Sequence, residues 1–365
     1  MSAAPAPRLV VARARLASQW LLPGAGARPT PAAVVGQLGL LQAQDLGQAF
    51  WALGVRSPGS TASSVRAAFD DGSIVRTWAA RGTLMIVRPG LLDDLLTVTG
   101  PRMRAQTATG FRQAGISEQD VEAVAPVALQ RCADGATRGQ LLEAFRFAGQ
   151  ETSGQRGYLL LMALSVARIL VQGPLEGSGS ARQLFVPYRS WIGGSGNDGG
   201  DRRAALERLA LCYFGGHGPA TEADFAWWLG LPLTPVRATL ATLLDAGSLA
   251  SRRVEGIDYW MAPATAAGLD AGVPVPGART VLALPGFDEF LLGYRDRRAS
   301  LSAEHAPRVV PGGNGVFRRT IVHGGATIGI WDPDAGAEPF GTDLGPGAAR
   351  AFAARMREYS DFRAR

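Results

Sequence analysis

The order of the predicted elements most constrains the fold of this chain, and it is clearest between residues 203 and 261. Thr221 is a good N-cap and Pro235 a good first helical residue, and Gly230-Leu231-Pro232 breaks the chain between the two helices that they open. The expected elements are helices over 203–214, 222–229 and 235–245, then strands over 248–254 and 258–261. A helix, a short glycine-containing turn and a second helix form the helix-turn-helix signature, and the hairpin adds the wing of a winged helix.

The same order of helices and a hairpin recurs twice earlier in the chain. Its first copy has a start signal at Thr30-Pro31, and its second copy opens with Ser117 in a capping box. The first copy comprises helices 8–22, 32–41 and 63–69 with strands 73–79 and 83–87, and the second comprises helices 117–130, 137–147 and 158–167 with strands 169–172 and 183–187. Three winged helices in tandem are therefore expected.

The last quarter of the chain follows a different pattern. After a connector rich in proline and glycine over 271–277, we expect a strand over 281–285, a hairpin over 317–331 and a closing helix over 346–363. The fold class is therefore mainly α with small β-hairpins, built from three tandem winged-helix motifs and a C-terminal β-rich module. The expected domains are 1–115, 116–200, 201–270 and 271–365, with a linker rich in glycine at 193–200.

Composition limits the chemistry that the chain can perform. All 37 basic residues are arginine, a preference that a GC-rich coding sequence explains, and no lysine is present to form a Schiff base. Only the N-terminal amine remains for that chemistry. The net charge of +6 and the isoelectric point near 10.0 favour an anionic partner, of which nucleic acid is the commonest.

The sequence predicts neither a metal site nor a membrane segment. Cys132 and Cys212 are far apart in helical patterns, which favours buried thiols, and the three histidines lack the spacing of zinc ligands. No run of about 18 apolar residues appears, and the first residues lack the core of a signal peptide. We therefore expect a soluble protein of the reducing cytoplasm.

The tripeptide Gln42-Ala43-Gln44 is the most informative short motif. Glutamine does not titrate near neutral pH, so two of them cannot act as an ordinary acid and base. Their amides can instead orient a water and place dipoles against a developing positive charge, which suits a reaction whose leaving group is already activated. The alternative is an ordinary helix end, because the motif follows a strongly apolar helical pattern.

Five stretches in order along the chain carry a resemblance to a known family. They are LLQAQD at 40–45, VRTWAARGTLMIV at 75–87, GPATEADFAWWLGLPL at 218–233, LPGFDEFLLGYRDR at 284–297 and RVVPGGNGVFRRTIVHGGATIGIW at 308–331. Over nearly its whole length the chain resembles the bacterial winged-helix DNA glycosylases, which comprise the AlkZ-like enzymes and their YcaQ-like relatives.

The resemblance implies a site and a substrate. Gln42 and Gln44 match, position by position, the glutamine-apolar-glutamine motif that is catalytic in AlkZ-like members. It also implies three winged helices that curve around duplex DNA, hydrolysis of bulky N7-alkylguanine and unhooking of interstrand crosslinks. One position departs from the pattern, because Met85 stands where relatives commonly carry histidine, and any contribution of that histidine to holding DNA or water is in doubt here.

The chemistry of alkylated guanine agrees with an uncharged catalytic pair. Alkylation at N7 leaves a cationic base that departs readily, and two amide carbonyls can align a water while facing the oxocarbenium-like sugar. A spacing of two places both side chains on one face of an extended segment but about 200° apart on a helix. We therefore predict that the motif lies where the helix ends. For Asp45, a helix-end contact is favoured over a catalytic role.

Candidate DNA contacts lie at the first wing and in a glycine-rich loop. Arg76 and Arg81 flank the wing and are candidates for phosphate contacts, with a solvated wing as the alternative. A loop ahead of Arg318 and Arg319 is suited to entering the minor groove beside a lesion, with a plain turn as the alternative. The candidate residues of that loop are Gly312, Gly313 and Asn314.

Two other groups favour structural roles. The pair Trp227-Trp228 at helical sites is typical of core packing rather than of base stacking. The pair Asp288-Glu289 lacks a third ligand type at the spacing of a metal site, which favours an internal salt-bridge network.

These features predict a monofunctional DNA glycosylase that hydrolyses the N-glycosidic bond of N7-alkylguanine, with crosslink unhooking as an extension of that activity in DNA repair or antibiotic self-resistance. The expected partner is double-stranded DNA carrying alkylated guanine, bound by a monomer. No cofactor is needed, and no lyase activity is expected without lysine. Two alternatives stay open: a winged-helix transcriptional regulator without catalysis, and a resistance protein that sequesters a DNA-damaging natural product.

Overall fold

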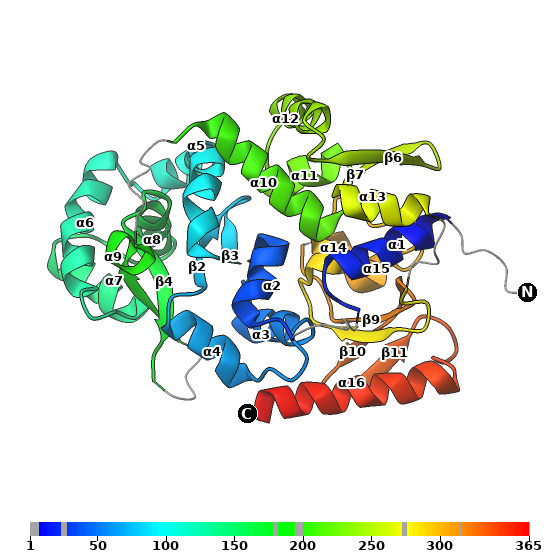
Figure 1. Cartoon of the computed structure of the whole chain (residues 1–365). Helices are drawn as coiled ribbons and strands as arrows, with labels where there is room; N and C mark the ends of the chain where they lie inside the picture. Colours follow the sequence, from blue (N-terminus) through cyan, green and yellow to red (C-terminus); the bar gives the residue numbers. More distant parts are fainter. Residues whose placement is uncertain are drawn as a thin grey trace, which may run out of the picture. The chain divides into compact units, whose positions relative to one another are not determined.

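The computed structural model describes residues 7–22, 28–177, 182–193, 200–271, 276–313 and 315–364. The chain forms two compact units, the first from residues 1–65 and 207–365 and the second from residues 66–206. It passes from one to the other within helices α4 (Ala62–Asp70) and α10 (Arg202–His217), which Figure 1 shows. Helix is the commonest regular structure in both units, and each unit also carries antiparallel strands.

Among the described residues, the second unit combines five complete helices with an antiparallel sheet. The hairpin expected near residue 80 is confirmed: Val75 pairs with Val87, and Ala79 pairs with Thr83. Strand order in this unit is β3-β2-β4-β5. Its elements are β2 (Val75–Ala79), β3 (Thr83–Val87), α5 (Pro89–Gln113), α6 (Glu118–Arg131), α7 (Arg138–Phe147), α8 (Arg156–Val166), β4 (Leu170–Leu175), β5 (Gln183–Pro187) and α9 (Tyr188–Ile192).

Local capping explains where the helices of the second unit begin. Ser117 forms the predicted capping box with Asp120 at the start of α6, and Thr137 forms another at the start of α7. These helices pack around a core that includes Trp78 and Cys132. The prediction of a buried thiol is confirmed for Cys132, whose burial raises its pKa to about 12, whereas Cys212 is only partly buried.

The first unit contains the two helices and the intervening turn over which the sequence predicts a helix-turn-helix. Thr221 caps α11 in a capping box with Asp224, and Gly230 ends that helix in the left-handed conformation. The expected helices and hairpin are confirmed, although α12 begins two residues before Pro235. The elements of this part are α1 (Pro7–Ser18), α2 (Pro31–Leu38), β1 (Leu40–Gln42), α3 (Leu46–Gly54), α11 (Glu222–Leu229), α12 (Leu233–Asp245), β6 (Ala250–Val254), β7 (Ile257–Met261) and α13 (Pro263–Asp270).

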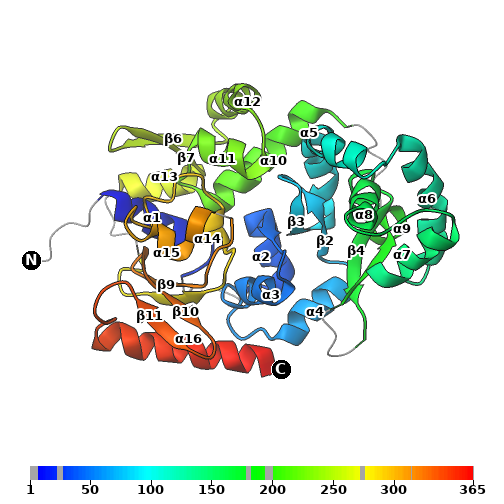
Figure 2. The same ribbon diagram turned by 180° about the vertical axis from the view of Figure 1, so that it is seen from behind.

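The C-terminal module of the first unit is an antiparallel sheet in the order β11-β10-β9-β8. The expected strand, hairpin and closing helix are confirmed, and the helix packs against β8. Figure 2 shows this helix, α16, running below β10 and β11. The elements are β8 (Val281–Leu284), α14 (Glu289–Leu292), α15 (Ala306–Val309), the 3₁₀ turn η1 (Pro311–Gly313), β9 (Thr320–His323), β10 (Ala326–Asp332), β11 (Gly336–Pro339) and α16 (Pro346–Ala364).

Helix α3, which the sequence did not predict, fastens the N-terminal segment to this module. The indole N–H of Trp51 donates to the carbonyl of Ala283 in β8 at 2.8 Å. Its ring meets those of Tyr359 and Phe362 on α16, with centroids 5.2 Å and 5.4 Å away. The segment that precedes α3 is therefore held against residues far away in the sequence. Among the described residues, no helix is both long and apolar enough to cross a membrane.

Candidate active site

The glutamine motif lies outside any helix, as the spacing of its side chains predicts. Helix α2 ends at Leu38, earlier than the expected end at residue 41, because Gly39 adopts a positive φ of 79° that closes it. Strand β1 then carries the chain to Gln42, and Gln44 lies in a bend before α3. Gln42 is 8% exposed and Gln44 is exposed, so the motif reaches from the interior to the surface.

Asp45 has the helix-end role that the sequence favours. As the N-cap of α3, it accepts the backbone N–H of Gln48 at 3.1 Å and the side-chain N–H of the same residue at 3.0 Å. The amide oxygen of Gln48 in turn accepts the backbone N–H of Gly286. These bonds fix the first turn of α3 directly after Gln44.

A buried carboxylate contacts the backbone of the motif. Glu289 is 1% exposed, and its Oε1 accepts the backbone N–H of Gln42 at 3.3 Å. Its Oε2 accepts the indole N–H of Trp228 at 3.3 Å and lies 3.2 Å from Nε2 of His217. We call Glu289 and these three partners the carboxylate anchor.

Asp288 belongs to a second buried ion pair beside the anchor. Both of its oxygens accept from the Arg56 guanidinium at 2.8 Å, and Arg56 also donates to Gln19. Gln19 donates to the carbonyl of Glu289 at 3.2 Å and to the hydroxyl of Tyr294 at 3.1 Å. Burial raises the pKa of the Tyr294 phenol, so this group stays neutral near pH 7. The predicted internal network around Asp288-Glu289 is confirmed.

The side chains around His217 leave the anchor little freedom to move. The Tyr213 ring stacks on the imidazole with centroids 4.6 Å apart, and the Trp228 ring meets it at 5.6 Å. Gly293 makes this fit possible, because a Cβ atom there would lie 2.6 Å from the His217 ring and 2.5 Å from the carbonyl of Glu289. The imidazole is fully buried.

Residues 311–319, which we call the arginine loop, hold the candidate DNA contacts of the C-terminal module. Gly312 and Gly313 are exposed with φ of 63°, and a Cβ atom on either would meet no described atom within 4 Å. Asn314 lies outside the described residues. Arg318 is exposed at the end of the loop.

Arg319, the next residue, is already engaged by its own module. Its guanidinium pairs with Asp332 at 3.5 Å and lies over the Trp331 ring, 5.5 Å from the centroid. A cavity of about 380 Å³ opens beside it, lined by residues of β10 and β11, by Arg318 and by Gln48 of α3. The arginine loop and the helix that follows the glutamine motif therefore share one hollow of the first unit.

The remaining candidate arginines belong to the second unit. Arg76 lies on β2 and is half-buried, and it donates to the side-chain oxygens of Gln172 at 3.1 Å and Gln183 at 3.3 Å. Arg81 is half-buried at the turn of the hairpin. Both arginines thus lie on the hairpin of β2 and β3, where the sequence places them.

Three further positions singled out by sequence have buried surroundings. Met85 is fully buried on β3 opposite Thr77, so its side chain belongs to the interior. Trp228 is 1% exposed, which confirms the prediction of core packing, and Trp227 is half-buried with the Arg297 guanidinium 5.4 Å from its ring centroid.

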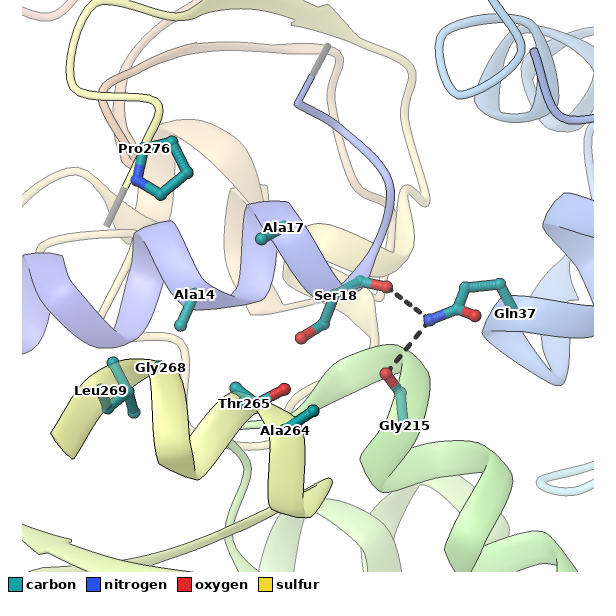
Figure 3. A pocket seen from close by; sticks show the side chains of 10 residues that line it. All are labelled: Ala14, Ala17, Ser18, Gln37, Gly215, Ala264, Thr265, Gly268, Leu269 and Pro276. Atoms are coloured by element: carbon teal, nitrogen blue, oxygen red, sulfur yellow. Dashed lines mark hydrogen bonds between the residues drawn. The ribbon is translucent and has the colours of Figure 1, made fainter. Parts of the chain in front are cut away.

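A second cavity of the first unit, of about 440 Å³, has a different character. Small and neutral residues of α1, α10 and α13 line it, together with Gln37 of α2. Figure 3 shows the Gln37 amide turned toward the carbonyls of Ser18 and Gly215, to which it donates at 2.9 Å and 3.1 Å. None of its described lining residues is charged, so it offers little to a phosphate.

The sequence did not reveal the link between the motif and the buried carboxylate. The sequence pattern predicts a structural network for Glu289 and indicates no role for His217. The available signal was the placement of two acids between apolar residues, LPGFDEFLL at 284–292, because carboxylates in such a run must find buried partners. Within the described ranges, no group of three or more His, Cys, Asp or Glu residues is arranged to hold a metal.

Comparisons with known proteins agree on one family. The family model for AlkZ-like DNA glycosylases matches residues 35–362. An interstrand DNA cross-link repair glycosylase of Streptomyces sahachiroi is 27% identical over 326 residues, which cover 87% of this chain and 85% of that protein. The solved structure of the Streptomyces sahachiroi DNA glycosylase AlkZ has a TM-score of 0.81 and 27% identity, over 100% of this chain and 98% of that one.

Proposed function

Because the chain belongs to the AlkZ-like DNA glycosylase family, we propose that it releases N7-alkylguanine from duplex DNA with Gln42 and Gln44 as its catalytic residues. As a family member it is a hydrolase that acts on an N-glycosidic bond. One observation carries the catalytic assignment. Both glutamines lie outside any helix, because strand β1 ends at Gln42 and Gln44 follows in a bend. Gln44 is exposed, and the backbone N–H of Gln42 donates to the buried carboxylate of Glu289.

The proposed mechanism uses the charge of the damaged base itself. An N7-alkylated guanine is cationic and leaves as a neutral base, so a strong general acid is not required. The amide oxygens of Gln42 and Gln44 align a water behind C1′ and place their negative ends toward the oxocarbenium-like sugar. The water then adds to C1′, the C1′–N9 bond breaks, and the water proton passes to solvent.

Binding of duplex DNA is assigned to the two groups of arginines. Arg318 and Arg319, together with Gly312, Gly313 and Asn314, contact the strand near the lesion, and Arg76 and Arg81 contact phosphates from the first wing. The proposal includes three winged helices within 1–115, 116–200 and 201–270, a C-terminal module over 271–365, and action as a monomer without a cofactor.

Crosslink unhooking is the natural extension of this activity. The Streptomyces sahachiroi relative is described as an interstrand DNA cross-link repair glycosylase. A guanine tethered to the opposite strand cannot swing freely into a closed pocket. The exposed position of Gln44 supports attack on a base that stays close to the duplex. Family membership does not favour the alternative of a transcriptional regulator.

The test is release of N7-methylguanine from a defined duplex under single-turnover conditions. Gln42→Ala and Gln44→Ala should each slow release roughly 100-fold, the scale measured for loss of one preorganised amide, and the double variant should be little worse than the slower single variant. Gln113→Ala, an exposed glutamine at the end of α5, is the control and should match the wild type.

The reaction product separates the hypotheses further. The abasic strand should stay intact until heat or base is applied, because no lysine is present for an imine route. Protection of an operator sequence without any base release would support a regulator. Tight binding of the free natural product without DNA would support a sequestering protein.

A further inference from the structure

The contact between Glu289 and Gln42 joins two segments that are 247 positions apart in the chain. The carboxylate accepts the backbone N–H of Gln42, so it holds the main chain of the motif at this residue. Glu289 is 1% exposed, and this burial keeps bulk water from replacing the bond.

The donors around Glu289 require two acceptor atoms. The backbone N–H of Gln42 faces Oε1 and the indole N–H of Trp228 faces Oε2, and neither group can act as an acceptor. His217 Nε2 also faces Oε2 at 3.2 Å. The two oxygens of the Glu289 side chain each face one of these obligatory donors, whereas an amide of the same shape offers only one oxygen.

The anchor is also held firmly in place from its other side. Gln19 donates to the carbonyl of Glu289, and Asp288 caps α14 by accepting the N–H of Phe290 at 2.9 Å. Asp288 is itself clamped by Arg56. The position of the Glu289 carboxylate is therefore fixed by the fold, and that position in turn fixes where β1 ends.

We infer that Glu289 is a positioning residue for base release: its buried carboxylate sets the place of Gln42 through the backbone, and Trp228 and His217 hold that carboxylate. The inference rests on the proposed catalytic role of Gln42. Displacement of a catalytic group by about 1 Å is enough to cost on the order of 100-fold in rate, so the backbone bond has a direct consequence for chemistry.

The first test is Glu289→Gln, which keeps the size of the side chain but removes one acceptor. Either Gln42 N–H or Trp228 N–H must then face an NH₂ group. Hydrogen exchange at the backbone N–H of Gln42 should become at least roughly tenfold faster. Single-turnover base release should slow by about tenfold or more, while the affinity for duplex DNA stays within about twofold of wild type.

The second test is rescue, which a merely structural role would not produce. Adding Trp228→Phe removes the competing donor, so the amide at position 289 can turn its oxygen to Gln42 and its NH₂ to Nε2 of His217. Among the described residues, Nδ1 of His217 has no hydrogen-bond partner. The proton of the neutral imidazole can therefore move from Nε2 to Nδ1 without breaking a bond at Nδ1, and Nε2 then accepts. The double variant should regain slow exchange at Gln42, and its rate should approach that of Trp228→Phe alone.

Two results would overturn the inference. One is wild-type exchange and wild-type base release in Glu289→Gln. The other is a single-turnover rate of base release in Glu289→Gln/Trp228→Phe that stays below the rate of Trp228→Phe alone. This comparison also tests the inference if Glu289→Gln by itself fails to fold. The proposed function fails separately: Gln42→Ala with a wild-type rate would refute it, while exchange at the Gln42 amide would still report on the anchor.

Discussion

The carboxylate anchor and the arginine loop differ in how tightly the protein holds its polar groups. Glu289 is buried among donors from three different segments, and Gly293 admits no side chain beside it. A Cβ atom on Gly312 or Gly313 would meet no described atom within 4 Å, and Arg318 is exposed. In the first region the polar groups bond to each other, whereas in the second the Arg318 side chain is exposed to solvent.

This difference separates two kinds of work. A group that must face developing charge needs a fixed position, because its interaction is valuable only where the charge appears. A side chain that neutralises a phosphate needs to be exposed and long, since the electrostatic attraction between the two charges depends weakly on geometry and strongly on salt. Changes near the anchor should therefore alter stability and rate, and changes in the arginine loop should alter DNA affinity.

The largest expected effect is on stability, at the ion pair beside the anchor. Arg56→Met leaves the Asp288 carboxylate buried without its partner, so we expect a loss of about 3–5 kcal/mol in the free energy of unfolding. Urea denaturation of both proteins measures it. Arg237→Met is the matched control, because Arg237 pairs with Glu222 at the surface and its loss should change stability little. Equal stability of the two variants would contradict the contrast between buried and exposed charge.

The next effect should appear in DNA affinity, at the arginine loop. Arg318→Ala should weaken binding about tenfold and lower the slope of log affinity against log salt by about 1, while the rate of base release at saturating protein stays near wild type. Arg319→Ala should do less, because its guanidinium is already paired with Asp332. Fluorescence anisotropy across a salt series measures both, and Arg355→Ala on α16 serves as a control. A salt slope unchanged by Arg318→Ala would remove that residue from the DNA contacts.

The smallest expected effect concerns Asp45, which stands next to the motif but acts as a cap. Asp45→Ala should cost about 1 kcal/mol of stability, and Asp45→Asn should cost less because asparagine also caps well. Neither change should slow base release more than about threefold. A much slower reaction in both variants, with stability preserved in Asp45→Asn, would show that the carboxylate takes part in the chemistry.

Much of the local structure could be predicted from the sequence. Thr30, Thr221 and Ser117 cap the helices that they were expected to cap, because a hydroxyl that satisfies a free backbone N–H is a strictly local signal. The break in the helix at the glutamine motif was also predictable, since two side chains spaced by two residues share a face only in extended chain.

The long-range features could not be predicted in the same way. Helix α3 is short and follows the motif closely, and it was missed because its Trp51 is explained only by contacts with β8 and α16. The bond from Gln42 to Glu289 depends on how distant segments pack, and no local pattern encodes that. Arg319 illustrates the same limit, because its ion pair with Asp332 is invisible until β10 is folded.

The most direct test of the account is to measure base release and DNA affinity on one N7-methylguanine duplex for Gln42→Ala, Gln44→Ala and Arg318→Ala. Both glutamine variants should lose roughly 100-fold in single-turnover rate while binding DNA as the wild type does, and Arg318→Ala should show the opposite pattern. Glutamine variants that release the base at the wild-type rate would contradict it.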